Sequence, residues 1–102
     1  MQINFHIEGV VISDKDETEM EEKIKNLEKY VREPAIADVY IVDESGKQSK
    51  SGVDKRVKLS VLMGKEKIFI EELDNNPIQA FAKSYHRLKS NLEEFHSRLT
   101  NN

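Results

Sequence analysis

Residues 2–31, QINFHIEGVVISDKDETEMEEKIKNLEKYV, decide the fold, because the spacing of their apolar residues changes part-way along. At the start, apolar and polar side chains alternate, with Ile3, Phe5 and Ile7 on one side, which is typical of a half-buried strand. After Ser13 the apolar residues recur three and four apart, which indicates a helix with one buried face. The apolar residues of this predicted helix are Met20, Ile24, Leu27 and Val31.

The predicted helix has recognisable signals at both ends. Ser13 is suited to cap it, since its hydroxyl can accept a hydrogen bond from the first turn. Three carboxylates follow directly, where the positive end of the helix dipole favours negative charge: Asp14, Asp16 and Glu17. Pro34 is expected to end the helix.

The remainder of the chain predicts three more strands and one long helix. The strands are expected at residues 37–44, 53–64 and 65–73. Asn76 can cap the last helix, and Pro77 suits its first position because the missing N–H costs nothing there. The last helix carries a sustained apolar seam of Phe81, Tyr85, Leu88, Leu92, Phe95 and Leu99.

The order of elements, β-α-β-β-β-α, predicts an α+β fold with a four-stranded mixed sheet and two helices packed on one face. A right-handed crossover should join the first two strands in parallel, and the others should form antiparallel hairpins. A chain of 102 residues suits one domain, expected at residues 1–99. Residues 45–52 are expected to form a polar, flexible loop, and residues 100–102 a short disordered tail.

Several functional classes are disfavoured by the sequence. It has no cysteine, and no apolar run approaches the roughly 20 residues that span a bilayer, so we expect a soluble cytoplasmic protein without a membrane partner. It has no Gly-rich phosphate loop and no nucleophile elbow. His86 and His96 lie too far apart along one helix to share a metal ion. We therefore expect no catalysis, no cofactor or metal, and no small-molecule substrate.

Basic side chains recur on both predicted helices. On the first helix Lys25, Lys29 and Arg32 form a band on one flank, and Lys23 lies on the opposite flank. On the last helix a second band lies opposite the apolar seam. If the helices lie side by side, these bands would form one surface for RNA phosphates. Alternatively, they are ordinary solvated helix faces, and the net charge of −3 argues for this. The candidate RNA-binding residues are Lys23, Lys25, Lys29, Arg32, Lys83, Arg87 and Arg98.

The predicted sheet leaves one face uncovered. By strand alternation Tyr40, Leu62 and Phe69 lie on this open face. The polar and charged residues expected beside them include His6, Arg56, Lys58 and Lys67. A few exposed apolar residues are normal on such a face. The other interpretations are a contact surface for a protein partner or for a second copy in a weak homodimer, or a platform for stacked bases.

Two segments resemble a known family. KIKNLEKY at residues 23–30 and NNPIQAFAKSYHRLKSNLEEFHSRL at residues 75–99 are similar to the short ribosome hibernation-promoting factors and ribosome-associated inhibitors. These are also called sigma-modulation or light-repressed proteins, and the resemblance extends from the opening residues to Leu99. It implies a non-enzymatic factor that binds small-subunit rRNA in the channel for messenger and transfer RNA. It further implies that the factor silences translation during stress.

The resemblance extends to individual positions, with some departures. The basic residues that match basic positions of the family are Lys23, Lys29, Arg87 and Arg98. Asn26, Ser90 and Glu94 stand where the family commonly has basic residues, and Glu93 adds negative charge. These departures imply weaker phosphate contacts, or a copy that has diverged into a protein-interaction or self-associating module using the open face of the sheet.

Overall fold

The predicted order of strands and helices is confirmed by a computed structural model, which describes residues 1–44 and 54–100. Its elements are β1 (Gln2–Glu8), α1 (Asp14–Lys25), η1 (Asn26–Tyr30), β2 (Ala35–Asp43), β3 (Lys55–Met63), β4 (Glu66–Asp74) and α2 (Pro77–Thr100). The predicted loop at residues 45–52 lies outside the described residues. So do residues 101 and 102 of the predicted tail, whereas Thr100 ends α2.

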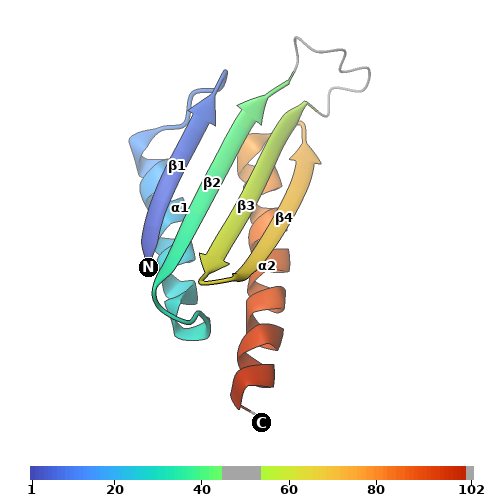
Figure 1. Ribbon diagram of the computed structural model, residues 1–102. Coiled ribbons are helices and arrows are strands. Elements are labelled where there is room, and N and C mark those ends of the chain that lie inside the picture. Colours follow the sequence, from blue (N-terminus) through green and yellow to red (C-terminus); the bar gives the residue numbers. More distant parts are fainter. Residues whose placement is uncertain (45–53, 101–102) are drawn as a thin grey trace.

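The sheet has the predicted mixed topology. Its strand order is β1-β2-β3-β4, with β1 parallel to β2 and the other neighbours antiparallel. Figure 1 shows α1 and α2 behind the same face of the sheet, as predicted, with α1 behind β1 and β2 and α2 behind β3 and β4. The other face of the sheet carries no covering element among residues 1–44 and 54–100.

The core lies between the sheet and the helices. Alternate residues of each strand face it, as the period of two requires. Fully burying a large aliphatic side chain contributes about 1.5–3 kcal/mol, so this layer supplies most of the driving force for folding. The buried residues include Met20, Ile24, Leu27, Val39, Ile41, Val57, Leu59, Val61, Met63, Ile70, Phe81, Leu88, Leu92 and Phe95.

The apolar seam of α2 is shorter than predicted. Leu88, Leu92 and Phe95 are buried, but Leu99 is 44% exposed. Leu99 lies in the last turn of α2, and Figure 1 shows the end of this helix extending beyond the ends of β3 and β4. The seam therefore ends at Phe95.

The first helix is also shorter than predicted. Helix α1 ends at Lys25, η1 continues to Tyr30, and Val31 is extended with φ −100° and ψ 156°, so the predicted continuation to Pro34 is wrong. In a 3₁₀ helix residues three apart share a side, so Leu27 and Tyr30 point the same way. Leu27 is buried, and the ring of Tyr30 meets His96 of α2 with centroids 5.9 Å apart.

Both predicted N-caps are confirmed. The Ser13 hydroxyl accepts a hydrogen bond from the Asp16 N–H at 3.1 Å. Asn76 Oδ1 accepts from the N–H groups of Ile78, at 2.8 Å, and Gln79, at 3.2 Å. Each cap satisfies N–H groups that have no partner within the helix, which fixes where the helix begins.

Candidate functional site

The two helices lie side by side and run in the same direction. The Lys23 ammonium of α1 lies 5.6 Å from the centroid of the Tyr85 ring of α2. Farther along the chain, the ring of Tyr30 in η1 meets the ring of His96 in α2. Because later residues of the first segment meet later residues of the second, the two C-terminal ends lie at the same end of the molecule (Figure 1).

Four candidate cations lie in α1 and η1 or just after them, and all four are exposed: Lys23, Lys25, Lys29 and Arg32. Within the part of the chain that the structure describes, none of them forms an ion pair with a carboxylate. Lys23 lies over Tyr85, and Lys29 lies over the neighbouring Tyr30 ring at 5.3 Å, both cation–π contacts that leave the positive charge in place.

The predicted helical band of Lys25, Lys29 and Arg32 does not form, because α1 ends at Lys25 and Lys29 lies in the 3₁₀ helix η1. Lys23 leaves α1 on a different side from Lys25, about 200° around the helix, as expected from the sequence. Arg32 lies beyond η1 and therefore has no helical position; its backbone N–H donates to the Met63 sulfur at 3.5 Å. The cations therefore surround the C-terminal end of α1 and the η1 segment, and do not follow one stripe.

Two of the predicted cations of α2 are held by β4. The Lys83 ammonium donates to the Leu73 carbonyl at 2.7 Å and lies 3.1 Å from Asp74 Oδ2. Arg87 Nη1 donates to Glu72 Oε1 at 2.9 Å and also contacts the Glu71 carbonyl at 3.2 Å. Both positive charges are thus offset by an adjoining carboxylate.

The two groups of cations are separated. The side of α2 that meets the first helical segment carries Tyr85 and His96. Lys83 and Arg87 instead reach β4, on the other flank of α2. Arg98 also lies on the β4 side, where it lines a shallow surface depression with Lys67 and Phe69. The single continuous basic surface expected from the sequence is therefore divided in two.

Pairing of Lys83 and Arg87 with carboxylates of β4 was not predicted from the sequence. Glu72 and Asp74 alternate with Leu73 on β4, so they share the face of Ile70, which is buried. A carboxylate on the inner face of a strand requires a polar or cationic partner. Lys55 of β3 lies opposite Asp74 but pairs with Asp43 and Asp54, so the covering helix is left to supply the partner. Strand alternation was therefore a usable signal for these ion pairs.

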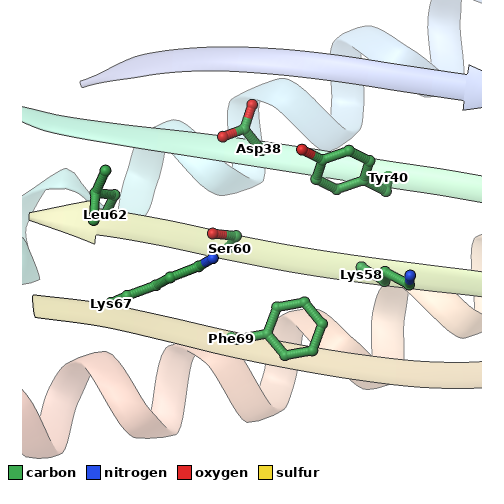
Figure 2. Close-up of a pocket in the computed structure, with 7 residues that line it drawn as sticks. All are labelled: Asp38, Tyr40, Lys58, Ser60, Leu62, Lys67 and Phe69. Carbon is green, nitrogen blue, oxygen red and sulfur yellow. The ribbon is translucent and has the colours of Figure 1, made fainter.

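The open face of the sheet contains a hollow of about 360 Å³. Tyr40, Leu62 and Phe69 lie there as predicted, 36%, 40% and 50% exposed. Figure 2 shows them with four polar side chains from β2, β3 and β4. The hollow is lined by Asp38, Tyr40, Lys58, Ser60, Leu62, Lys67 and Phe69.

Most charges on the open face are already paired. Arg56 is held between Glu44 and Glu71. Asp38 lies 3.0 Å from His6 Nε2, and accepts a second hydrogen bond from an asparagine amide on β1. Two lysines of this face differ, because Lys58 and Lys67 have no ion pair with any carboxylate of the described residues.

Residues 1–44 and 54–100 contain neither a metal-binding cluster nor a membrane-spanning helix. No group of three or more histidine, aspartate or glutamate side chains there is arranged to hold a metal ion. No helix in these ranges is both long enough and apolar enough to cross a membrane.

A family model described as sigma 54 modulation protein / S30EA ribosomal protein matches residues 3–100. The chain belongs to this family. The resemblance noted at residues 23–30 and 75–99 is thereby confirmed, since both segments lie within the match. No similar protein was found among curated sequences.

Solved structures share the fold of this S30EA-family protein. The N-terminal domain of Protein Y from Thermus thermophilus is similar with a TM-score of 0.73 and 22% identity, over 93% of this chain and 99% of that one. A ribosomal subunit interface protein from Coxiella burnetii is similar with a TM-score of 0.70 and 15% identity, over 95% and 99% of the two chains. At these identities the likeness establishes the fold.

Proposed function

We propose that this protein is a ribosome hibernation factor that binds small-subunit rRNA in the channel for messenger and transfer RNA. In this proposal it is not an enzyme and needs no cofactor: it works in the cytoplasm and blocks translation by occupying the channel. Membership of the S30EA family supports a ribosomal role. The Coxiella burnetii structure with the same fold is described as a ribosomal subunit interface protein, which points the same way.

The observation that carries the proposal is the set of exposed cations around the C-terminal end of α1. Within the described residues, Lys23, Lys25, Lys29 and Arg32 have no carboxylate partner, so their charge remains available for phosphates. Phosphate contacts of this kind read the shape and charge of folded RNA and require no base-specific contact.

The acidic net charge is compatible with this surface because most carboxylates of α1 lie toward its start, although Glu21 and Glu22 directly precede Lys23. Its first turn carries Asp14, Asp16 and Glu17, whereas Lys23 and Lys25 lie in its last turn. A local positive field can therefore face RNA while acidic groups face elsewhere, although the net charge is −3. The helix dipole favours the same arrangement, with anions at the first turn and cations at the last.

The α2 cations have a lesser part in this proposal. The charges of Lys83 and Arg87 are offset by Asp74 and Glu72, so a phosphate meets a weaker positive field there or displaces the carboxylate. The net gain is smaller than for a cation that was free beforehand. Arg98 lies on the β4 side of α2 as well, and we assign it to the same secondary group.

Co-sedimentation with purified ribosomal subunits tests this function. We expect the protein to pellet with small subunits and not with large subunits. Each phosphate contact releases counterions, so four contacts would weaken binding about a hundredfold between 50 and 200 mM salt. Pelleting that is equal for both subunits, or that does not change with salt, would contradict the proposal.

A further inference from the structure

We propose that the hollow on the open sheet face is a second binding surface, for a short unpaired strand of nucleic acid. In this proposal the bases stack on the aromatic rings of the hollow and the phosphates meet its lysine side chains. It goes beyond the proposed function, because it concerns the opposite side of the sheet from the helices and single-stranded instead of folded nucleic acid.

The aromatic side chains of the hollow are placed for stacking. Phe69 is half-exposed, with its ring over the open face (Figure 2). Tyr40 is held in place by His6, since the two rings are stacked with centroids 4.4 Å apart and an interplanar angle of 13°. His6 covers Tyr40 from the β1 side, and Tyr40 lines the hollow on its other side. Exposed aromatic rings on a four-stranded sheet are a recurrent platform for unpaired bases.

The charge of the hollow complements a polyanion. Lys58 and Lys67 lack carboxylate partners in the described part of the chain. The carboxylate nearest to Lys58 in register is Glu71, but Glu71 binds Arg56. Asp38 is engaged by His6. Asp38 keeps its negative charge beside a neutral His6, so two ammonium groups against one carboxylate give the lining of the hollow an excess of one positive charge.

The two lysines start from different positions along the strands, which suits a nucleic-acid strand with more than one phosphate. Lys67 is opposite Leu62, and Lys58 precedes Leu62 by four residues on β3, so the two backbone positions are about 13 Å apart along the strands. Figure 2 shows Lys67 reaching toward Ser60 and Lys58 at the other end of the hollow, with Phe69 between them. Cations on either side of a stacking ring match a base with a phosphate before and after it.

A second copy of the chain fits this face less well. Its own open face would have to offer carboxylates to Lys58 and Lys67. Asp38 and Glu71, the carboxylates nearest to those lysines in register, already contact His6 and Arg56. Among the described residues this leaves Glu8, at the end of the edge strand β1, as an exposed carboxylate of this face without an ion pair. Nucleic acid supplies phosphates for Lys58 and Lys67 and flat bases that can stack on Phe69 and Tyr40.

Fluorescence anisotropy with a labelled hexauridylate tests the proposal on the purified protein. Phe69→Ser should weaken binding about tenfold or more, since stacking on one aromatic ring typically accounts for a factor of that size. Lys67→Gln should weaken binding and lower the slope of log affinity against log salt by about 0.7, the value for one phosphate of a single strand. A stable hairpin without unpaired bases should bind more weakly than hexauridylate.

Lys65→Gln is the matched control, because it removes one lysine charge in the turn between β3 and β4 without touching the hollow. It should leave hexauridylate affinity within about twofold. Equal losses from Lys65→Gln and Lys67→Gln would overturn the proposal, as would wild-type affinity in Phe69→Ser that circular dichroism shows to be folded. A hexaglutamate that competes as well as hexauridylate would assign the face to an acidic protein.

Two further measurements distinguish this proposal from a dimer interface and from the proposed rRNA surface on the helix side. A concentration-dependent dimer that Phe69→Ser dissociates, with no binding of hexauridylate, would assign the face to a second copy and overturn the proposal. Small-subunit pelleting of Phe69→Ser reports on the helix side of the molecule. Loss of hexauridylate binding with pelleting retained is the expected result, and it separates the two surfaces.

Discussion

Lys83 of α2 and Asp74 of β4 join the start of the last helix to the end of the preceding strand, with Lys83 Nζ 3.1 Å from Asp74 Oδ2. The other oxygen of Asp74 accepts a hydrogen bond from the Asn76 N–H at 3.2 Å, where the helix cap begins. A lysine that the sequence assigned to RNA binding is therefore part of the fold. Ion pairs of this kind distinguish the predicted cations of α2 that already have a carboxylate partner, Lys83 and Arg87, from the cations near α1 that have none among the described residues.

The ion pair predicts a pH dependence of stability. The Lys83 ammonium, through its hydrogen bond, lowers the pKa of Asp74 below its usual value. A folded-state pKa below the unfolded one stabilises the protein above the unfolded pKa of about 4, and this contribution is lost as the pH falls through the folded pKa. In Lys83→Gln the pKa of Asp74 should rise and the loss of stability below about pH 4 should become shallower.

Carbon-detected NMR titration of the Asp74 carboxyl measures this pKa directly. Lys89→Gln serves as the control, since it removes a lysine of α2 that has no carboxylate partner among the described residues. An Asp74 pKa that is the same in the wild type and in Lys83→Gln would show that the ion pair does not form in solution.

Two leucines of the predicted α2 seam should respond differently to truncation. Leu92 is buried, so Leu92→Ala should lower the free energy of unfolding by about 2–5 kcal/mol through lost burial and a cavity. Leu99 is exposed in the last turn of α2, so Leu99→Ala should cost less than about 0.5 kcal/mol. Urea denaturation followed by circular dichroism distinguishes these values, and similar costs would mean that the end of α2 packs against something.

The cap of α2 predicts that two neighbouring asparagines differ in their contribution to stability. Asn76→Ala should cost about 1 kcal/mol, because two backbone N–H groups lose their acceptor. Asn75 is its exposed neighbour, and Asn75→Ala should stay within about 0.5 kcal/mol of the wild type. The same urea experiment measures both, and a larger cost at Asn75 would place the start of the helix elsewhere.

The division of the cations predicts unequal effects on ribosome binding. Lys25→Gln with Lys29→Gln removes two free charges and should weaken small-subunit binding more than Lys83→Gln with Arg87→Gln. The α2 double variant should instead show the clearer loss of thermal stability, because it leaves Asp74 and Glu72 without their cations. Equal effects of the two double variants on pelleting would mean that the α2 ion pairs open at no cost on the ribosome.

Strand alternation and helix capping carried most of the fold prediction. The alternation of Ile3, Phe5 and Ile7 placed β1 correctly, and Asn76–Pro77 marked the start of α2. The end of α1 was mispredicted because Val31 continues the 3–4 spacing of the helix. The chain instead tightens into η1, where Tyr30 shares a side with Leu27 and meets His96. The spacing of nearby residues does not show which side chain will pack against a helix that is distant in the sequence.

The candidate site was predicted less completely than the fold. A helical projection located each cation on its own helix but could not show what lies next to that helix. The partners of Lys83 and Arg87 come from β4, and their contact depends on the packing of α2 against the sheet. On the open face, by contrast, strand alternation was enough to place Tyr40, Leu62 and Phe69 on the same side of the sheet. Their strands are antiparallel neighbours, so this placement does not depend on how the helices pack.

Small-subunit pelleting of Lys25→Glu with Lys29→Glu, at low salt, is the most direct test of the central claim that free cations beside α1 hold rRNA. Lys15→Glu with Lys65→Glu is the matched control, because it makes the same change in net charge at two exposed lysines elsewhere. We predict that the α1 variant stays in the supernatant while the control pellets like the wild type. Wild-type pelleting of the α1 variant, with its circular dichroism unchanged, would contradict the account.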